Sequence, residues 1–258
     1  MSVLQIARKN YVVMGVANER SIAWGVAKRL LEEEATVIFT YRKERSKLKI
    51  EKLLTNYPNS NTALFECDVN SDDSIAAAFT QIGEQFGEIE GIVHSVAFAH
   101  AEDLRTDFVN TSRDGYAFAQ DTSAYSLVAV AKAAKPYFSP TTSIVTMSYL
   151  GAERVLPGYN VMGVAKAALE AAMRYLAYDL GASGVRVNAI SAGAIRTLAA
   201  KGVPSFNDIL HKIEDNSPLR RNTNQEEVAD MTLVMLSPLS RGVTGETIYV
   251  DSGYHIMG

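Results

Sequence analysis

The sequence predicts an α/β fold: one doubly wound parallel sheet of seven strands with helices on both faces. Seven short, nearly continuous apolar runs alternate with longer segments that show helical periodicity. Parallel strands need crossover connections, so this alternation favours a parallel sheet that is covered on both sides. No repeat, linker-like stretch or second pattern interrupts the alternation, and we therefore expect a single domain over residues 1–258.

The predicted elements follow one another in a regular order. Strands are expected at 11–16, 36–41, 63–69, 91–97, 143–148, 185–191 and 247–251, and helices at 21–34, 71–87, 116–138 and 160–178. Two segments break this order: a polar loop at 98–111, and residues 192–207, which contain glycine and proline before helix resumes. Both follow the carboxyl ends of predicted strands, where open α/β sheets bind ligands. We expect them to wall the site, with 192–207 as the substrate-binding loop.

Composition excludes several classes of protein. Hydrophobic residues make up 47% of the chain, which rules out general disorder, and the single cysteine, Cys67, cannot form an internal disulfide. We expect Cys67 to be a core residue within the third strand. No apolar run reaches about 18 residues, and no signal-peptide pattern is present, so we expect a cytoplasmic protein without membrane contact. The net charge of −4 without a basic block argues against nucleic acid, and the scattered histidines argue against a metal site.

The turn after the first predicted strand suits a nucleotide. Gly15 permits a tight turn, Ser21 is placed to cap the next helix, and the helix N-terminus offers N–H groups to a pyrophosphate. Gly25 would let this helix approach the sheet. The segment is not a G-x-G-x-x-G motif, so an ordinary structural turn is the alternative interpretation.

Positive charge follows the second predicted strand, where folds that bind NAD usually place an acid. Arg42 and Lys43 stand there instead, and cations attract the 2′-phosphate that distinguishes NADPH from NADH. The segment therefore favours NADPH, with NADH as the alternative cofactor and a solvated helix start as the alternative interpretation. After the third strand, Asp68 is placed either to accept from the adenine amino group or to cap the next helix.

Tyr159 and Lys166 lie seven residues apart. In a helix that begins near Tyr159 this spacing is almost two turns, so the two side chains share one face. A lysine cation near a phenol stabilises the phenolate and lowers its pKa, which prepares the tyrosine for proton transfer. Tyr149, just past the fifth strand, is placed to face the same pocket. Simple packing is the alternative role for these tyrosines.

These motifs together resemble the short-chain dehydrogenase/reductase superfamily, and within it the NAD(P)H-dependent enoyl-acyl-carrier-protein reductases of bacterial type II fatty-acid synthesis. Superfamily members that reduce ketones use Tyr-x3-Lys, whereas this chain has Tyr-x6-Lys and carries Gly163 four residues after Tyr159. Two departures from the family pattern are Ala194, where many members have proline, and Ala199, where several have serine. The resemblance lies in GVANERSIAWGVAK (15–28), TYRKERS (40–46), SYLGAERVLPGYNVMGVAKAALEA (148–171), RVNAISAGAIRTLAAKG (186–202) and VTGETIYVDSG (243–253).

The resemblance implies a Rossmann-type domain that reduces trans-2-enoyl thioesters to acyl thioesters with NADPH, in the last step of fatty-acid elongation. It implies catalytic roles for Tyr159, which would face the thioester carbonyl, for Tyr149, which would orient the substrate, and for Lys166, which would hold the nicotinamide ribose. The implied acyl pocket comprises Ala97, Ala99, Met162, Val203 and Phe206. The implied cofactor-binding residues are Gly15, Ser21, Ile22, Arg42, Lys43, Glu44, Arg45, Ser46, Asp68, Val69, Val96, Lys166, Ile195, Arg196, Thr197, Leu198 and Ala199.

The resemblance also implies two protein partners: an acyl carrier protein that bears enoyl chains, and further copies of the chain in a homotetramer. Because the carrier is acidic and this chain is net negative, their encounter needs a local basic patch, for which Arg196, Lys201, Arg220 and Arg221 are candidates. Two other functions stay open on the sequence. One is a 3-ketoacyl or other carbonyl reductase of the same superfamily, and the other is a non-catalytic NADP-binding sensor.

Overall fold

The computed structural model describes residues 3–197 and 206–257, and its strands form one parallel seven-stranded sheet in the order β3-β2-β1-β4-β5-β6-β7. Every pair of neighbouring strands is parallel. The predicted fold class is therefore confirmed, and each predicted strand overlaps an observed one. The strands are β1 (Asn10–Met14), β2 (Thr36–Tyr41), β3 (Thr62–Glu66), β4 (Ile89–His94), β5 (Phe138–Ser148), β6 (Arg186–Ala192) and β7 (Thr247–Val250).

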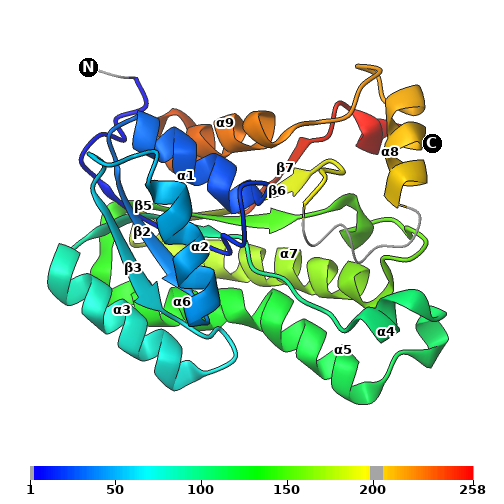
Figure 1. Cartoon of the computed structure of the whole chain (residues 1–258), viewed down its shortest axis with the longest axis horizontal. Coiled ribbons are helices and arrows are strands. Elements are labelled where there is room, and N and C mark those ends of the chain that lie inside the picture. Colours follow the sequence, from blue (N-terminus) through cyan, green and yellow to red (C-terminus); the bar gives the residue numbers. More distant parts are fainter. Residues whose placement is uncertain (1–2, 198–205, 258) are drawn as a thin grey trace.

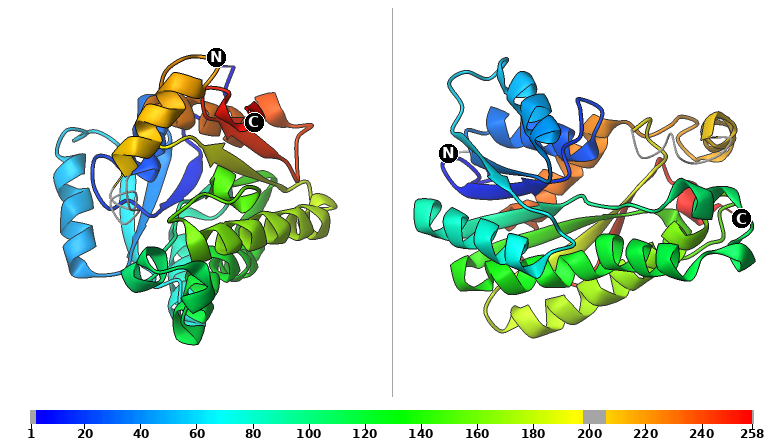
Figure 2. Two further views of the ribbon diagram at one scale, coloured as in Figure 1. Left: turned by 90° about the vertical axis from the view of Figure 1, so that its right-hand side faces the viewer. Right: turned by 60° about the horizontal axis from the view of Figure 1, so that its bottom comes forward.

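Helices cover both faces of this sheet (Figure 1). One face carries α1 (Ile22–Glu32), α2 (Glu44–Leu54) and α9 (Gln225–Leu236). The other carries α3 (Asp72–Phe86), α6 (Ser126–Ala134) and α7 (Asn160–Gly181), which run side by side in Figure 2, and α5 (Arg113–Gln120), which leads into α6. The short α4 (Ala101–Arg105) and α8 (Phe206–Asn216) lie at one end of the sheet.

Two apolar clusters, one on each side of the sheet, form the core. Val12 and Ile38 pack with residues of α3 and α6, whereas their neighbours Val13 and Phe39 pack with residues of α1 and α9. Because strands of a doubly wound sheet are buried on both faces, successive residues are apolar, which is why the strand segments appear as continuous apolar runs. Trp24 of α1 adds an aromatic contact, its ring centroid 6.3 Å from that of Phe39.

Four local predictions need correction. The predicted helix at 116–138 is divided by a π-helical turn at Asp121–Tyr125 and ends in a 3₁₀ turn at Lys135–Tyr137, which contains Pro136. The predicted polar loop at 98–111 contains α4 and a 3₁₀ turn at Phe108–Asn110. Gly25 faces α9 rather than the sheet, because a Cβ there would lie 2.6 Å from Cγ of Gln225. Cys67 is buried as expected but lies one residue past β3, and burial raises the pKa of its thiol to about 12.

Candidate active site

The predicted site residues gather at the carboxyl edge of the sheet. Strand order reverses between β1 and β4, and a sheet of this kind opens a crevice at such a switch point. Gly15 follows β1, Arg42 follows β2, Asp68 closely follows β3, Val96 closely follows β4 and Tyr149 follows β5. In Figure 1 the arrow of β5 points to this end of the molecule, which also carries α4 and α8.

The turn after β1 is narrow because it passes close to the end of β4. Gly15 has a φ of +93°, and a Cβ at this position would collide with the carbonyl oxygen of Ser95, so no other residue type fits. Ser21 occupies the N-cap position of α1, but its hydroxyl accepts hydrogen bonds from the backbone N–H groups of Ala17 (3.0 Å) and Asn18 (3.1 Å). The predicted capping bond from Ser21 is therefore wrong. Ile22 begins the helix, and the N–H groups of its first turn have no side-chain cap.

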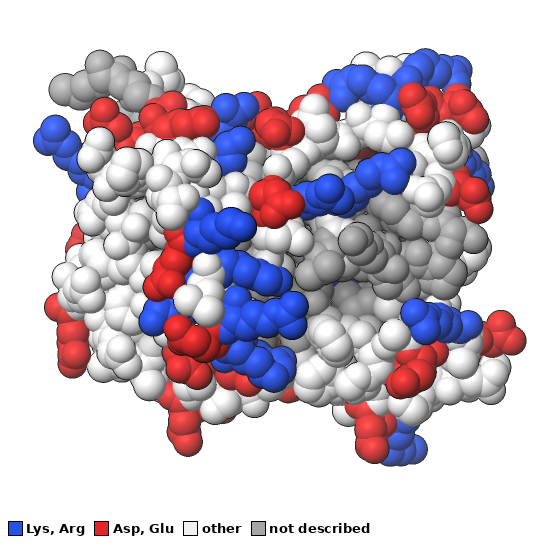
Figure 3. Space-filling model, in the orientation of Figure 1, with Lys and Arg blue, Asp and Glu red and all other residues white. Residues whose placement is uncertain are grey.

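The basic segment lies between β2 and α2. Arg42 and Lys43 are exposed, and Glu44, Arg45 and Ser46 form the first turn of α2. Figure 3 shows lysine and arginine side chains gathered on the face over α2. Nε of Arg42 lies 3.7 Å from Oδ2 of Asp68, which joins this segment to the end of β3. The negative average charge of the chain is thus locally reversed beside the crevice.

The segment after β3 has a separate cap for its helix. The hydroxyl of Ser71 accepts from the backbone N–H of Ser74 at 3.3 Å, so Ser71 rather than Asp68 caps α3. Oδ1 of Asp68 instead accepts from the backbone N–H of Asn70 at 3.1 Å. Val69 beside it is buried. The helix-cap alternative for Asp68 is therefore excluded, and its other carboxylate oxygen faces Arg42.

Two tyrosines meet where β5 approaches α7. The ring centroids of Tyr149 and Tyr159 are 5.0 Å apart at an interplanar angle of 74°, an edge-to-face contact. Tyr159 is the N-cap residue of α7, and a Cβ at Gly151 would collide with its ring, so the intervening glycine makes room for it. Burial raises the pKa of Tyr149 to about 12 and raises that of Tyr159 further. Both tyrosines therefore stay protonated at neutral pH.

Lys166 lies on the same helix, two turns beyond Tyr159, and is buried. Its Nζ donates to the carbonyl oxygen of Met147, the penultimate residue of β5, at 2.6 Å. Burial lowers the pKa of Lys166 to about 8. The predicted lowering of the Tyr159 pKa by this lysine is wrong in this structure, because desolvation of the phenol dominates and the ammonium is turned toward Met147.

His94 closes β4 beneath these groups. Its Nδ1 lies 3.0 Å from the Thr146 hydroxyl and its Nε2 lies 2.9 Å from the Ser126 hydroxyl, so both ring nitrogens are used. Burial, helped by the positive charge of Lys166, lowers the pKa of His94 to about 3. The imidazole is therefore neutral. Within 3–197 and 206–257, no group of three or more histidine, cysteine or acidic side chains is placed to hold a metal ion.

An apolar patch lies beside the tyrosines. Ala99 and Tyr159 pack against a small cluster that includes Met162 and Leu104. The Ser123 hydroxyl, from the π-helical turn, accepts from the backbone N–H of Phe98 at 3.0 Å and lies 3.1 Å from the Phe98 carbonyl oxygen. It also lies 3.8 Å from the Met162 sulfur. Ser123, which the sequence analysis did not single out, thus ties the 97–99 segment, with its exposed Ala97, to α7.

The segment after β6 is described only in part. Ile195, Arg196 and Thr197 follow β6, and Nη1 of Arg196 donates to Oδ1 of Asn207 at the start of α8, at 2.7 Å. The predicted residues Leu198, Ala199, Lys201 and Val203 lie outside the described residues. Phe206 begins α8, with only its backbone described.

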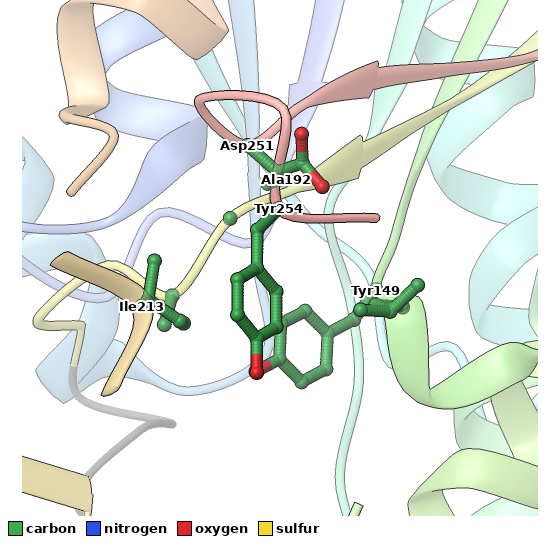
Figure 4. Close-up of a pocket in the computed structure, with 8 residues that line it drawn as sticks. Tyr149, Ala192, Ile213, Asp251 and Tyr254 are labelled. Carbon is green, nitrogen blue, oxygen red and sulfur yellow. The ribbon is translucent and has the colours of Figure 1, made fainter. Parts of the chain in front are cut away.

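A second residue of the site, Tyr254, was also missed at the sequence level. Tyr254 comes from the C-terminal segment and, with Tyr149 and Ile213 of α8, lines a small cavity that also contacts Asp251. Figure 4 shows Tyr254 and Tyr149 reaching toward one another across it. Asp251 holds this segment because its carboxylate accepts from the backbone N–H groups of Gly253 (3.0 Å) and His255 (2.8 Å). No motif in the sequence indicates that the C-terminus returns to the site.

Comparison with known proteins identifies relatives along nearly the whole chain. The family model described as "Enoyl-(Acyl carrier protein) reductase" matches residues 15–255. An enoyl-[acyl-carrier-protein] reductase [NADH] of Bacillus cereus is 54% identical over 97% of this chain and 98% of its own length. An enoyl-[acyl-carrier-protein] reductase [NADPH] of Staphylococcus aureus is also 54% identical, over 98% of each chain.

Solved structures agree with these sequence matches. The crystal structure of the Bacillus cereus enoyl-acyl carrier protein reductase with NADP+ and indole naphthyridinone superposes with a TM-score of 0.96. It shares 53% identity with this chain, and the match covers 100% of both. Among the described residues, no helix is both long and apolar enough to cross a membrane.

Proposed function

The chain belongs to the enoyl-(acyl carrier protein) reductase family of NAD(P)H-dependent oxidoreductases, and on this basis we propose how its residues bind NADPH and reduce an enoyl thioester. Its enoyl-acyl-carrier-protein reductase activity follows from this membership. The observation that carries the proposal is the meeting of Tyr149, Tyr159 and Lys166 at the end of β5, beside the switch point of the sheet.

The residues at the switch point fit a dinucleotide. The turn at Gly15 packs closely against the end of β4, and the N–H groups at the start of α1 beyond it have no side-chain cap that would compete with a pyrophosphate. Arg42 to Ser46 supply charge and hydroxyl groups for a 2′-phosphate, which favours NADPH over NADH. Asp68 and Val69 are placed for the adenine. Val96, Lys166 and residues 195–199 complete the proposed cofactor site.

When bound, the reduced nicotinamide supplies a hydride to the β-carbon of the enoyl thioester. Negative charge then develops on the thioester oxygen, and the Tyr159 hydroxyl donates a hydrogen bond to it. Protonation of the α-carbon completes the reduction to the saturated thioester. The raised pKa of Tyr159 suits this role, because the phenol keeps its proton and remains a donor. Tyr149, whose ring packs edge to face against that of Tyr159, orients the substrate. Lys166 holds the ribose and adds positive charge nearby.

The acyl chain would lie against the apolar patch beside Tyr159. We propose that Ala97, Ala99 and Met162 line one side of the acyl pocket. Val203 and Phe206, from the substrate-binding loop at 192–207, would complete it. The hydroxyl of Ser123 supports the pocket by fixing the backbone of Phe98 between the two alanines.

The substrate is carried by an acyl carrier protein, as the family name states. For docking, exposed Arg196 and Arg220 are the stronger described candidates, because they donate to the uncharged oxygens of Asn207 and of the Asp215 backbone, whereas the charge of Arg221 is paired with the Glu227 carboxylate at 2.5 Å. We place the chain in the cytoplasm as a single domain that assembles into a homotetramer. Tyr175 and Tyr178 on α7, 76% and 85% exposed, suit a contact between subunits.

NADPH oxidation with matched thioesters tests the proposed function. We expect the wild-type protein to oxidise NADPH with a crotonyl or longer enoyl thioester and to leave a 3-ketoacyl thioester unreduced, because its Tyr-x6-Lys spacing resembles that of the enoyl reductases and not the Tyr-x3-Lys of ketone-reducing members. Activity on the 3-ketoacyl thioester alone would assign a carbonyl reductase. Cofactor binding without either activity would assign an NADP-binding sensor.

A further inference from the structure

α7 presents two buried, charged side chains to the end of β5. Lys166 and Glu170 lie four residues apart on one face of the helix, and each is only 6% exposed. Nζ of Lys166 donates to the Met147 carbonyl oxygen at 2.6 Å, while the Ser148 hydroxyl donates to Oε1 of Glu170. Met147 and Ser148 are the last two residues of β5, so both contacts end directly before Tyr149.

A buried charge is costly unless other groups compensate it. Burial, together with the negative charge of Glu153, raises the pKa of Glu170, and the hydrogen bond from Ser148 and the positive charge of Arg174 partly offset that rise. For Lys166 the signs are reversed: burial lowers its pKa to about 8, and the negative charge of Glu170 opposes that fall. The carboxylate thus favours the charged form of the lysine.

The other groups around this pair come from several elements. His94 of β4 faces Lys166 but is neutral. The exposed carboxylate of Glu153 faces Glu170 and also bonds the hydroxyl of Tyr249 on β7. Thr247 of β7 places its hydroxyl beside Glu170, and Arg174 follows one turn later on α7. Of the acidic groups in this set, Glu170 is the one that shares the buried face of α7 with Lys166, one helical turn away.

We propose that Glu170 is a positioning residue for the reaction: its carboxylate is the counter-charge of the buried Lys166 ammonium, and its bond with Ser148 fixes the end of β5 next to Tyr149. The role rests on the proposed functions of Tyr159 and Lys166. This role explains why the Glu170 carboxylate is buried one helical turn beyond Lys166, although the two side chains form no direct ion pair.

The pH dependence of kcat with a saturating enoyl thioester and NADPH tests the counter-charge. In Glu170→Gln, which keeps the shape and an acceptor for Ser148, we expect the basic limb near pH 8 to move about one pH unit lower. In Ser148→Ala the carboxylate loses a stabilising hydrogen bond, so the limb should move in the same direction by a smaller amount. Glu153→Gln, which removes the neighbouring exposed carboxylate, is the matched control and should retain the wild-type limb.

Thermal unfolding provides a readout that does not depend on turnover. The Tm deficit of Glu170→Gln relative to wild type should be largest at pH 7 and narrow toward pH 10, because a neutral Lys166 no longer needs a counter-charge. The proposal would be overturned if the basic limbs of the kcat profiles of Glu170→Gln and Ser148→Ala coincided with the wild-type limb. It would also be overturned if the Tm deficit of Glu170→Gln did not change with pH. An inactive wild-type protein would instead contradict the proposed function, and the Tm comparison would still decide the role of Glu170.

Discussion

Replacing Lys166 with alanine is expected to lower kcat/KM for an enoyl thioester about 100-fold or more, because the change removes a buried cation from the reacting end of the site. The ammonium is placed by α7 and by the end of β5, where it donates to the Met147 carbonyl oxygen. The proposed reaction develops negative charge nearby, and a fixed positive charge stabilises it most in the transition state. Steady-state NADPH oxidation checks the expectation, with exposed Lys132→Ala on α6 as the control.

Tyr159→Phe tests the same step from the substrate side. The variant removes only the hydroxyl and keeps the ring that packs against Tyr149 and beside Gly151. We expect kcat to fall roughly 10- to 100-fold with a smaller change in KM, since the lost hydrogen bond strengthens as charge appears. If Lys166→Ala and Tyr159→Phe both turned over the enoyl thioester at the wild-type rate, the catalytic assignment would be wrong.

The second prediction with a large expected effect, after that for the catalytic pair Lys166 and Tyr159, concerns cofactor preference. Replacing Arg42 and Lys43 together with alanine is expected to raise the KM for NADPH roughly 10- to 100-fold, because the 2′-phosphate loses charge-assisted bonds. The KM for NADH should change little, since NADH has no 2′-phosphate. The ion pair of Arg42 with Asp68, at 3.7 Å, holds this guanidinium between the ends of β2 and β3.

Parallel kinetics with the two cofactors measure this preference. Lys49→Ala, which removes an exposed charge later in α2, is the control for a general loss of positive potential. Equal increases in KM for NADPH and NADH would show that the segment acts on both cofactors alike. The assignment of Arg42 and Lys43 to the 2′-phosphate would then fail.

The sequence predicted most of the fold because the strands are buried on both faces. β2 was predicted with its observed limits, since acidic residues at 32–34 precede the segment and the basic pair at 42–43 follows it. The division of the 116–138 helix was not predicted, because a π-helical turn arises from tertiary contacts rather than from local propensity. Ser123 in that turn bonds the Phe98 backbone 25 residues away, a contact that periodicity does not encode.

The site was predicted where a short spacing carries it and missed where distant segments meet. Tyr159 and Lys166 lie on one helix, so their common face follows from their separation. The opposing effects of burial on the pKa values of these two residues depend on the packed structure and were not predicted. Tyr254 reaches the site from the C-terminal segment through a turn organised by Asp251, far from Tyr149 in sequence.

The central claim is that Tyr159 faces the substrate oxygen while Lys166 faces the cofactor ribose. A crystal structure with NADP+ and a saturated acyl thioester tests it directly. We predict the thioester oxygen within hydrogen-bond distance of the Tyr159 hydroxyl, about 2.7 Å, and Nζ of Lys166 turned from the Met147 carbonyl oxygen to the ribose hydroxyls. A thioester oxygen bound away from Tyr159, with Lys166 still donating to Met147, would contradict the account.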